Sequence, residues 1–257
     1  MDISGFLIDL DGTLYQGSRL IPGAVEAVDR LRADQVPILF TTNTSRKSQA
    51  DILTFLADLG FQARKEEIFS APVAAAEWLA GQGINQIQLL VPESTHDDFR
   101  QFTITDDQPE AVLVGDLGAG FTFERLNEAF RSLRAGARLV AIHRNRFWIP
   151  DAVLTLDAGP FVAALEYGAG VEATLVGKPS PAFFHTAAAR TGAELGGLAV
   201  VGDDVESDIK GARLAGLTAI QVRTGKFDTL RNAEVPSEHQ AHRVIDSIRD
   251  LPGLLHD

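Results

Sequence analysis

The chain has 257 residues, 45% of them hydrophobic, which is enough for one large domain or for a core with an inserted module. Lys and Arg number 23 against 35 Asp and Glu, and the resulting formal charge of −12 argues against binding to a nucleic-acid backbone, which needs clustered positive charge. The absence of cysteine excludes disulfides, thiolate zinc sites and cysteine nucleophiles.

The sequence shows no segment that would carry the chain into a membrane. No run of about 18 apolar residues occurs. The N-terminus enters an apolar strand pattern directly, without the basic and long apolar regions of a signal peptide. We therefore expect a cytoplasmic protein with no membrane partner.

The chain opens on a short apolar stretch that ends in two acidic residues. Residues 5–8 are followed by Asp9 and Asp11, and Gly12 allows a sharp backbone turn beside them. This pattern predicts a buried strand of a parallel sheet, and ligands of such sheets bind beyond the carboxyl ends of the strands. Two carboxylates held together repel one another, so we expect a bound cation or a carboxyl group that keeps its proton. An aspartate that only caps a helix would leave the downstream pattern unexplained.

The following residues alternate helix and strand patterns. An amphipathic helix pattern leads to an apolar run over residues 36–40, and a second helix would be capped by Ser45 and ended by Gly60. This β-α-β-α order is typical of a doubly wound parallel sheet. Thr42 and Asn43 follow the second strand at a helix N-terminus, where hydroxyl and amide groups can hold an anion. Simple helix capping explains them equally well on local grounds.

Residues 71–177 continue the α/β rhythm without comparable polar strand ends. Strands are predicted over residues 87–91, 111–114, 139–142 and 173–176, and helices over residues 71–80, 123–134 and 159–167. We expect a small α/β module inserted between the two halves of the core. Its loop over residues 143–148 is basic and aromatic, so it could face a substrate. We favour a surface loop whose Phe147 and Trp148 pack inward.

Two further polar groups follow this module. Lys178 stands in a proline-bounded turn before a predicted helix, where a fixed ammonium suits a phosphate or a carboxylate, although a loop that only starts a helix is the alternative. A predicted strand over residues 198–201 ends at Asp203, and Asp208 lies close behind it among four acids. Such oxygen ligands suit Mg²⁺. The remaining chain is predicted to form a helix over residues 207–215, a strand over 218–222 and an amphipathic helix over 244–251.

Taken in order, four groups of residues resemble the four motifs of the haloacid dehalogenase superfamily of phosphotransferases: Asp9, Asp11 and Thr13; Thr42 and Asn43; Lys178; and Gly202, Asp203 and Asp208. Segments such as VGDDVESDIKGA are similar to the branch that includes phospholysine phosphohistidine inorganic pyrophosphate phosphatase. Roughly 130 residues separate the second and third motifs, which implies a large cap. The resemblance therefore implies a doubly wound, Rossmann-like α/β core over residues 1–70 and 178–257, with a smaller α/β cap domain over residues 71–177.

The resemblance also implies a role for each residue in phosphate hydrolysis. Asp9 would be the nucleophile that forms an aspartyl-phosphate, and Asp11 would be the general acid and then the general base. Thr42 and Asn43 would hold phosphoryl oxygens, and Lys178 would neutralise charge on the nucleophile and the phosphate.

The same resemblance implies a Mg²⁺ cofactor. Asp9, the main-chain carbonyl of Asp11, and Asp203 would bind the ion, and Asp208 would be a further ligand or would lie behind the ligands.

The leading interpretation is a Mg²⁺-dependent phosphatase, a phosphoric monoester hydrolase that acts on a small phosphorylated metabolite. Pyrophosphate and N-phosphorylated compounds are alternative candidate substrates. Analogy with related caps suggests a homodimer. One alternative is a receiver-like signalling protein, but its phosphorylated aspartate would lie on a middle strand, and the long insert has no counterpart there. The other is a protein that binds phosphate metabolites without turnover, against which Asp9 and Asp11 both argue.

Overall fold

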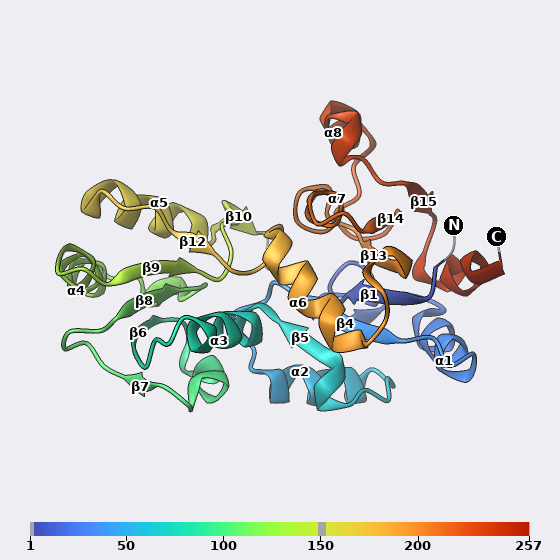
Figure 1. The fold of residues 1–257 in the computed structure, drawn as a ribbon. Helices are drawn as coiled ribbons and strands as arrows, with labels where there is room; N and C mark the ends of the chain where they lie inside the picture. Colours follow the sequence, from blue (N-terminus) through green and yellow to red (C-terminus); the bar gives the residue numbers. More distant parts are fainter. Residues whose placement is uncertain (1–2, 149–152, 257) are drawn as a thin grey trace. The chain divides into compact units, whose positions relative to one another are not determined.

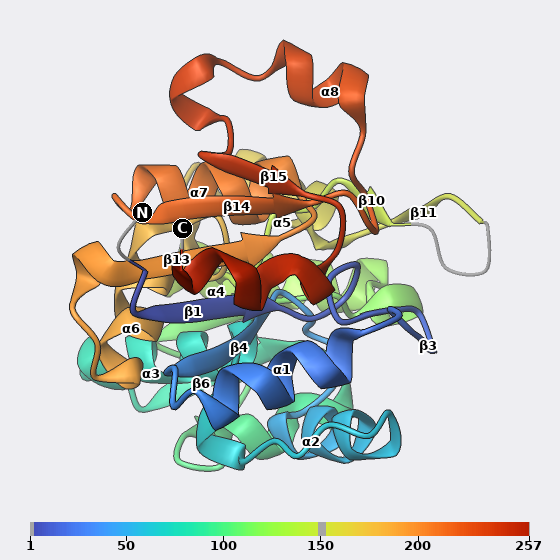
Figure 2. The same ribbon diagram turned by 90° about the vertical axis from the view of Figure 1, so that its right-hand side faces the viewer.

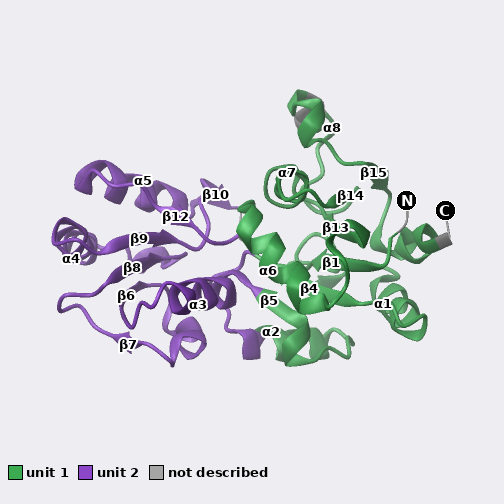
Figure 3. Cartoon of the chain, viewed as in Figure 1, with its two compact units in different colours: residues 1–42, 52–69, 178–257 green, residues 43–51, 70–177 purple. Residues whose placement is uncertain are grey.

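The computed structural model describes residues 3–148 and 153–256, and its chain forms two compact units (Figure 3). The first unit comprises residues 1–42, 52–69 and 178–257, and the second comprises residues 43–51 and 70–177. Both units are α/β structures with parallel sheets, as the alternating helix and strand patterns predict.

The first unit is built on a six-stranded sheet in the order β15-β14-β13-β1-β4-β5 (Figure 1). Its strands are β1 (Gly5–Asp9), β4 (Ile38–Thr42), β5 (Ile68–Ser70), β13 (Leu198–Gly202), β14 (Thr218–Val222) and β15 (Arg243–Ile245). Every residue of β1, β4 and β13 is buried. Parallel strands covered on both faces read as continuous apolar runs, which is why the sequence pattern located these three strands.

Helices cover both faces of this sheet. They are α1 (Ala24–Ala33), α2 (Gln49–Asp58), α6 (Pro181–Thr191) and α7 (Lys210–Leu214), while α8 (Thr229–Glu234) lies in the segment that connects β14 to β15. Figure 2 shows α1 and the 3-10 helical segment Ile248–His256 in front of the sheet, with α6 and α7 behind it. A short hairpin of β2 (Tyr15–Gln16) and β3 (Arg19–Leu20) follows β1.

Two local predictions for this part of the chain were wrong. The helix predicted over residues 244–251 is instead β15 followed by the 3-10 segment, which contains Pro252, a residue that cannot donate a backbone hydrogen bond. Ser45 does not cap a helix, because α2 begins only at Gln49. The helix predicted over residues 207–215 was right in place, but it starts as a wide π-type turn over Val205–Ile209 before α7.

The second unit has a five-stranded sheet in the order β12-β9-β8-β6-β7, in which neighbouring strands pair in parallel. Its strands are β6 (Gln86–Leu90), β7 (Thr103–Ile104), β8 (Ala111–Val114), β9 (Arg138–Ala141) and β12 (Thr174–Leu175). Outside this sheet, β10 (Phe147–Trp148) pairs with β11 (Thr155–Leu156) in an antiparallel ribbon. Its helices are α3 (Ala71–Gly81), α4 (Phe123–Arg134) and α5 (Ala158–Ala169). Each predicted element of this segment is confirmed in type, with ends shifted by up to two residues.

Alternation along β8 explains how this sheet buries both faces. Leu113 packs into the core formed with α3, whereas Val112 and Val114 pack into the core formed with α4 and α5. Within the described residues, no helix is both long and apolar enough to span a membrane.

Candidate functional site

Three neighbouring strands of the first unit carry polar residues to one edge of the sheet. Asp9 is the last residue of β1, Thr42 is the last residue of β4, and Asp203 follows directly after β13. Because β1 pairs in parallel with both neighbours, these three strand ends lie side by side. The apolar strands thus fix where the polar side chains emerge.

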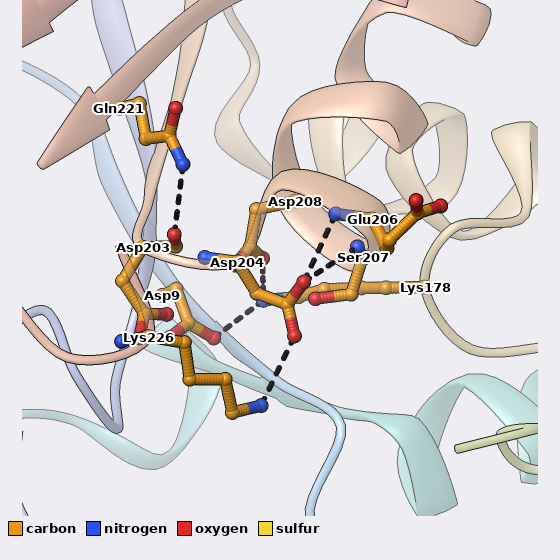
Figure 4. Close-up of polar contacts among 9 residues, drawn as sticks. All are labelled: Asp9, Lys178, Asp203, Asp204, Glu206, Ser207, Asp208, Gln221 and Lys226. Carbon is orange, nitrogen blue, oxygen red and sulfur yellow. Dashed lines mark hydrogen bonds and ion pairs between the residues drawn. The ribbon is translucent and has the colours of Figure 1, made fainter. Parts of the chain in front are cut away.

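Lys178 is buried against two of the acidic side chains (Figure 4). Its Nζ donates hydrogen bonds to Oδ1 of Asp9 at 2.6 Å and to Oδ1 of Asp208 at 2.7 Å. The side chain of Lys178 is only 1% exposed. Burial opposes its charge, but the carboxylates of Asp208 and Asp9 more than offset this and raise the pKa of Lys178, so the ammonium keeps its proton.

Asp9, Asp203 and Asp208 form a cluster in which one carboxylate oxygen of each residue lies within 4.8 Å of the others. The ammonium of Lys178 cannot neutralise all three buried carboxylates, and that of Lys226 pairs with a fourth acid, Asp204. Burial, followed by the negative charge of Asp9, raises the pKa of Asp203 to about 8 and that of Asp208 to about 7. Burial also raises the pKa of Asp9, despite the opposing effect of Lys178. Excess negative charge on closely spaced oxygen atoms fits a hard divalent cation, so these residues suit Mg²⁺.

The other predicted site residues, Asp11, Thr42 and Asn43, lie outside this cluster. Asp11 is exposed in the turn after β1, where its Oδ1 accepts a hydrogen bond from the N–H of Gly17 at 3.1 Å. Its side chain does not belong to the carboxylate cluster, so its predicted contact with a metal rests on its main-chain carbonyl. Thr42 is buried, and Asn43 is half-buried as the first residue of the second unit.

Sequence reasoning missed the loop that follows β14. The hydroxyl of Thr224 donates to the carbonyl oxygen of Gly12 at 2.5 Å, and the N–H of Lys226 donates to Oδ2 of Asp203 at 2.6 Å. The ammonium of Lys226 lies 3.0 Å from Oδ2 of Asp204. Polar residues at the end of a predicted strand were the available signal, because that strand lies next to β13.

The second unit holds a buried polar network of its own. Oγ of Ser45 lies 3.0 Å from Nε2 of His143 and accepts a hydrogen bond from the N–H of Asp116 at 2.8 Å. The guanidinium of Arg46 forms an ion pair with Asp116 at 2.5 Å. This network holds the segment that follows Thr42 along the chain.

The loop over residues 143–148 differs in part from the prediction. The guanidinium of Arg46 stacks on the ring of Trp148, with its carbon atom 4.4 Å from the ring centroid. Phe147, by contrast, is 51% exposed, so the expectation that both aromatic rings pack inward was wrong for this residue.

Comparisons with known proteins agree with this geometry. A haloacid dehalogenase-like hydrolase model matches residues 6–105, and a HAD-hydrolase-like model matches residues 175–251. Phospholysine phosphohistidine inorganic pyrophosphate phosphatase of Bos taurus is 36% identical over 98% of this chain and 94% of its own. Haloacid dehalogenase-like hydrolase domain-containing protein 2 of Bos taurus is 40% identical over 88% of this chain and 86% of its own.

Solved structures are also similar over nearly the whole chain. A 4-nitrophenylphosphatase from Thermotoga maritima superimposes with a TM-score of 0.92 at 26% identity and covers 99% of this chain and 98% of its own. A glycerol phosphate phosphatase from Mycobacterium tuberculosis, solved in complex with magnesium, gives a TM-score of 0.89 at 30% identity and covers 99% of this chain and 78% of its own.

Proposed function

This chain belongs to the haloacid dehalogenase-like hydrolases and is a phosphatase, and we propose from this premise that it hydrolyses a small phosphorylated metabolite through an aspartyl-phosphate on Asp9, with Mg²⁺ as cofactor. The observation that carries the proposal is the hydrogen bond from Lys178 to Asp9 within a cluster of buried carboxylates. A carboxylate at the end of a central strand, held by a buried ammonium, is poised to attack an electrophilic phosphorus atom.

The first half-reaction would transfer the phosphoryl group to Asp9. A carboxylate oxygen of Asp9 attacks phosphorus, the bond to the leaving oxygen breaks, and Asp11 gives its proton to that oxygen. Asp11 suits this role because it is exposed in the turn two residues after Asp9, where it can meet a substrate from solvent.

The second half-reaction would return the enzyme to its starting state. Asp11, now a carboxylate, takes a proton from water as the water attacks phosphorus, and the bond between phosphorus and Asp9 breaks. Inorganic phosphate leaves, Asp9 is again a carboxylate and Asp11 is again an acid.

The remaining site residues would bind and neutralise the phosphoryl group. Lys178 supports the proposal because its buried ammonium offsets charge on Asp9, and Thr42 with Asn43 would hold phosphoryl oxygens. Mg²⁺ would be held by Asp9, Asp203 and the main-chain carbonyl of Asp11. Asp208 would be a further ligand or would support the ligands without binding the ion. When bound, the ion supplies positive charge that stabilises the phosphoryl oxygens.

We propose that residues 71–177 form the cap that selects the leaving group, and that residues 1–70 and 178–257 form the core. Relatives named for pyrophosphate, phospholysine and phosphohistidine, and for glycerol phosphate, support small phosphate monoesters, pyrophosphate and N-phosphorylated compounds as candidate substrates. A homodimer formed through the cap, and a cytoplasmic location, stay predictions.

The test is phosphate release from a panel of these substrate classes, with Mg²⁺ or with a chelator. We expect turnover of at least one class in Mg²⁺, its loss in chelator, and its loss in Asp9→Asn, which keeps the size of the side chain but removes the nucleophile. Asp58→Asn, an exposed change at the end of α2, is the matched control. Turnover that survives Asp9→Asn would refute the nucleophile, and binding of a phosphorylated compound without any turnover would favour a non-catalytic protein.

A further inference from the structure

The carboxylate of Asp203 lies between the backbones of two glycines. A Cβ atom placed on Gly12 would lie 2.0 Å from Oδ2 of Asp203, and one placed on Gly225 would lie 2.0 Å from the same oxygen. Both glycines have positive φ, at +89° and +62°. Any side chain other than hydrogen at either position would therefore collide with this carboxylate and strain the backbone.

Hydrogen bonds from the loop after β14 enclose the Asp203 carboxylate. The N–H of Lys226 donates to Oδ2 of Asp203 at 2.6 Å, and the hydroxyl of Thr224 donates to the carbonyl of Gly12 at 2.5 Å. The loop thereby joins the end of β14 to the turn after β1, with the Asp203 side chain between them. The side-chain amide of Gln221, in β14 itself, also donates to the main-chain carbonyl of Asp203 at 2.9 Å.

We propose that Thr224, Gly225 and the backbone N–H of Lys226 form a positioning segment that fixes the Asp203 carboxylate for a divalent cation. This inference rests on the proposed function, in which Asp203 is a metal ligand. A carboxylate that can rotate freely loses conformational entropy when it binds an ion. The Asp203 carboxylate is already fixed in the folded protein by the N–H of Lys226 and by the close backbones of Gly12 and Gly225, so it loses less.

The segment also fits the charge of the site. A backbone N–H gives Asp203 a hydrogen bond without placing a full positive charge on the oxygen, so the carboxylate keeps its attraction for a cation. Removal of groups that orient metal ligands typically costs about 10- to 100-fold in metal affinity.

Two variants with matched controls test the segment. Gly225→Ala introduces the collision with Asp203, and Gly216→Ala, at φ +75° with no heavy atom within 4 Å of its Cβ, carries the same backbone strain without a collision. Thr224→Val removes the hydroxyl that reaches Gly12. Thr191→Val removes a hydroxyl that donates to a backbone carbonyl at 2.7 Å in α6, away from the carboxylate cluster.

The measurement is calorimetric titration of Mg²⁺ into each metal-free protein without substrate. We expect the Mg²⁺ dissociation constant to rise about 10-fold or more in Gly225→Ala relative to Gly216→Ala, and several-fold in Thr224→Val relative to Thr191→Val. If Gly225→Ala does not fold, the Thr224→Val pair decides.

The outcomes separate this inference from the proposed function. Wild-type protein that binds Mg²⁺, together with site variants that bind it as tightly as their controls, would overturn the positioning segment alone. Wild-type protein that binds no Mg²⁺ would overturn the metal assignment of the proposed function, and the inference with it.

Discussion

Lys178 and Asp9 are 169 residues apart in the chain, yet Nζ of the lysine lies 2.6 Å from Oδ1 of the aspartate. The same ammonium lies 2.7 Å from Asp208, so one buried cation serves two buried carboxylates. A lysine in this position stabilises negative charge on both acids.

Lys178→Met should therefore abolish most turnover. Methionine has a similar length but no charge, so Asp9 would lose the ammonium that favours its ionised form, and the transferring phosphoryl group would lose a neutralising charge. We expect kcat to fall by at least about 100-fold, the typical effect of removing one electrostatic stabiliser from a transition state. Steady-state phosphate release measures this loss.

Lys210→Met is the matched control for this prediction. Lys210 forms a partly exposed ion pair with Glu206 at 3.3 Å, one helical turn away. Such pairs contribute little to the stability of the fold. Its turnover should stay within about two-fold of wild type. Equal rates in the two lysine variants would contradict a role for Lys178 in charge neutralisation.

Asp11→Asn should slow proton transfer without disturbing the turn. Oδ1 of Asp11 accepts from the N–H of Gly17, and an asparagine oxygen can accept the same bond. With 4-nitrophenyl phosphate, whose leaving group needs little protonation, we expect the first half-reaction to persist and the second to slow by about 100-fold or more. Rapid-quench measurement should then show a burst of 4-nitrophenol and accumulated aspartyl-phosphate.

An Asp11→Asn enzyme with the wild-type steady-state rate and no burst would remove the acid-base role. Asn lacks a proton that it can give or take near neutral pH, so no compensating chemistry is available at that position.

Local patterns predicted the core of the fold because buried parallel strands produce continuous apolar runs. The runs that end at Asp9 and Asp203 were visible in this way, and adjacency of β1 and β13 then brought the two acids together. The neighbouring strand β4 was visible for the same reason. The sequence could place these residues because each follows its own strand directly.

Long-range contacts explain what local patterns missed. Ser45 follows a strand and precedes a helix, so it resembled a cap, but its hydroxyl pairs with His143, which lies 98 residues further along the chain. The loop at Thr224 contacts Gly12 across 212 residues, and the polar residues after the predicted strand do not by themselves identify Gly12 as the partner. The strand β15 was mistaken for a helix because a three-residue edge strand is too short to show a period.

The carboxylate cluster should make the stability of the metal-free protein depend on pH. Folding raises the pKa of Asp203 to about 8 and that of Asp208 to about 7, whereas unfolded aspartate titrates near about 3.9. Between these values the folded state binds more protons than the unfolded state, so the free energy of unfolding falls as pH rises. We expect the thermal midpoint in chelator to decrease from about pH 5 to about pH 8.

Mg²⁺ should reverse this trend because it binds the ionised carboxylates of the folded protein. At about pH 8 the ion should raise the thermal midpoint more than at about pH 5, where protons compete for the same oxygens. Asp203→Asn should flatten the pH dependence in chelator. A wild-type midpoint that stays constant in chelator across this range would contradict the raised pKa values.

The last prediction concerns the buried network of the second unit. Oγ of Ser45 is buried, accepts from the N–H of Asp116 at 2.8 Å and lies 3.0 Å from Nε2 of His143. Ser45→Ala leaves both groups without this partner, and a buried polar group that loses its hydrogen bond costs about 1–3 kcal/mol of unfolding free energy. Urea denaturation measures the loss.

Ser94→Ala provides the comparison for this variant. The hydroxyl of Ser94 donates to the carbonyl of Arg46 at 2.8 Å, but Ser94 is exposed, so water can replace the bond. We expect a loss of less than about 0.5 kcal/mol there. If Ser45→Ala were no less stable than Ser94→Ala, the network would not stabilise the segment after Thr42. A clear difference would mean that the segment next to the proposed phosphate-binding residues depends on a partner 98 residues away for its stability.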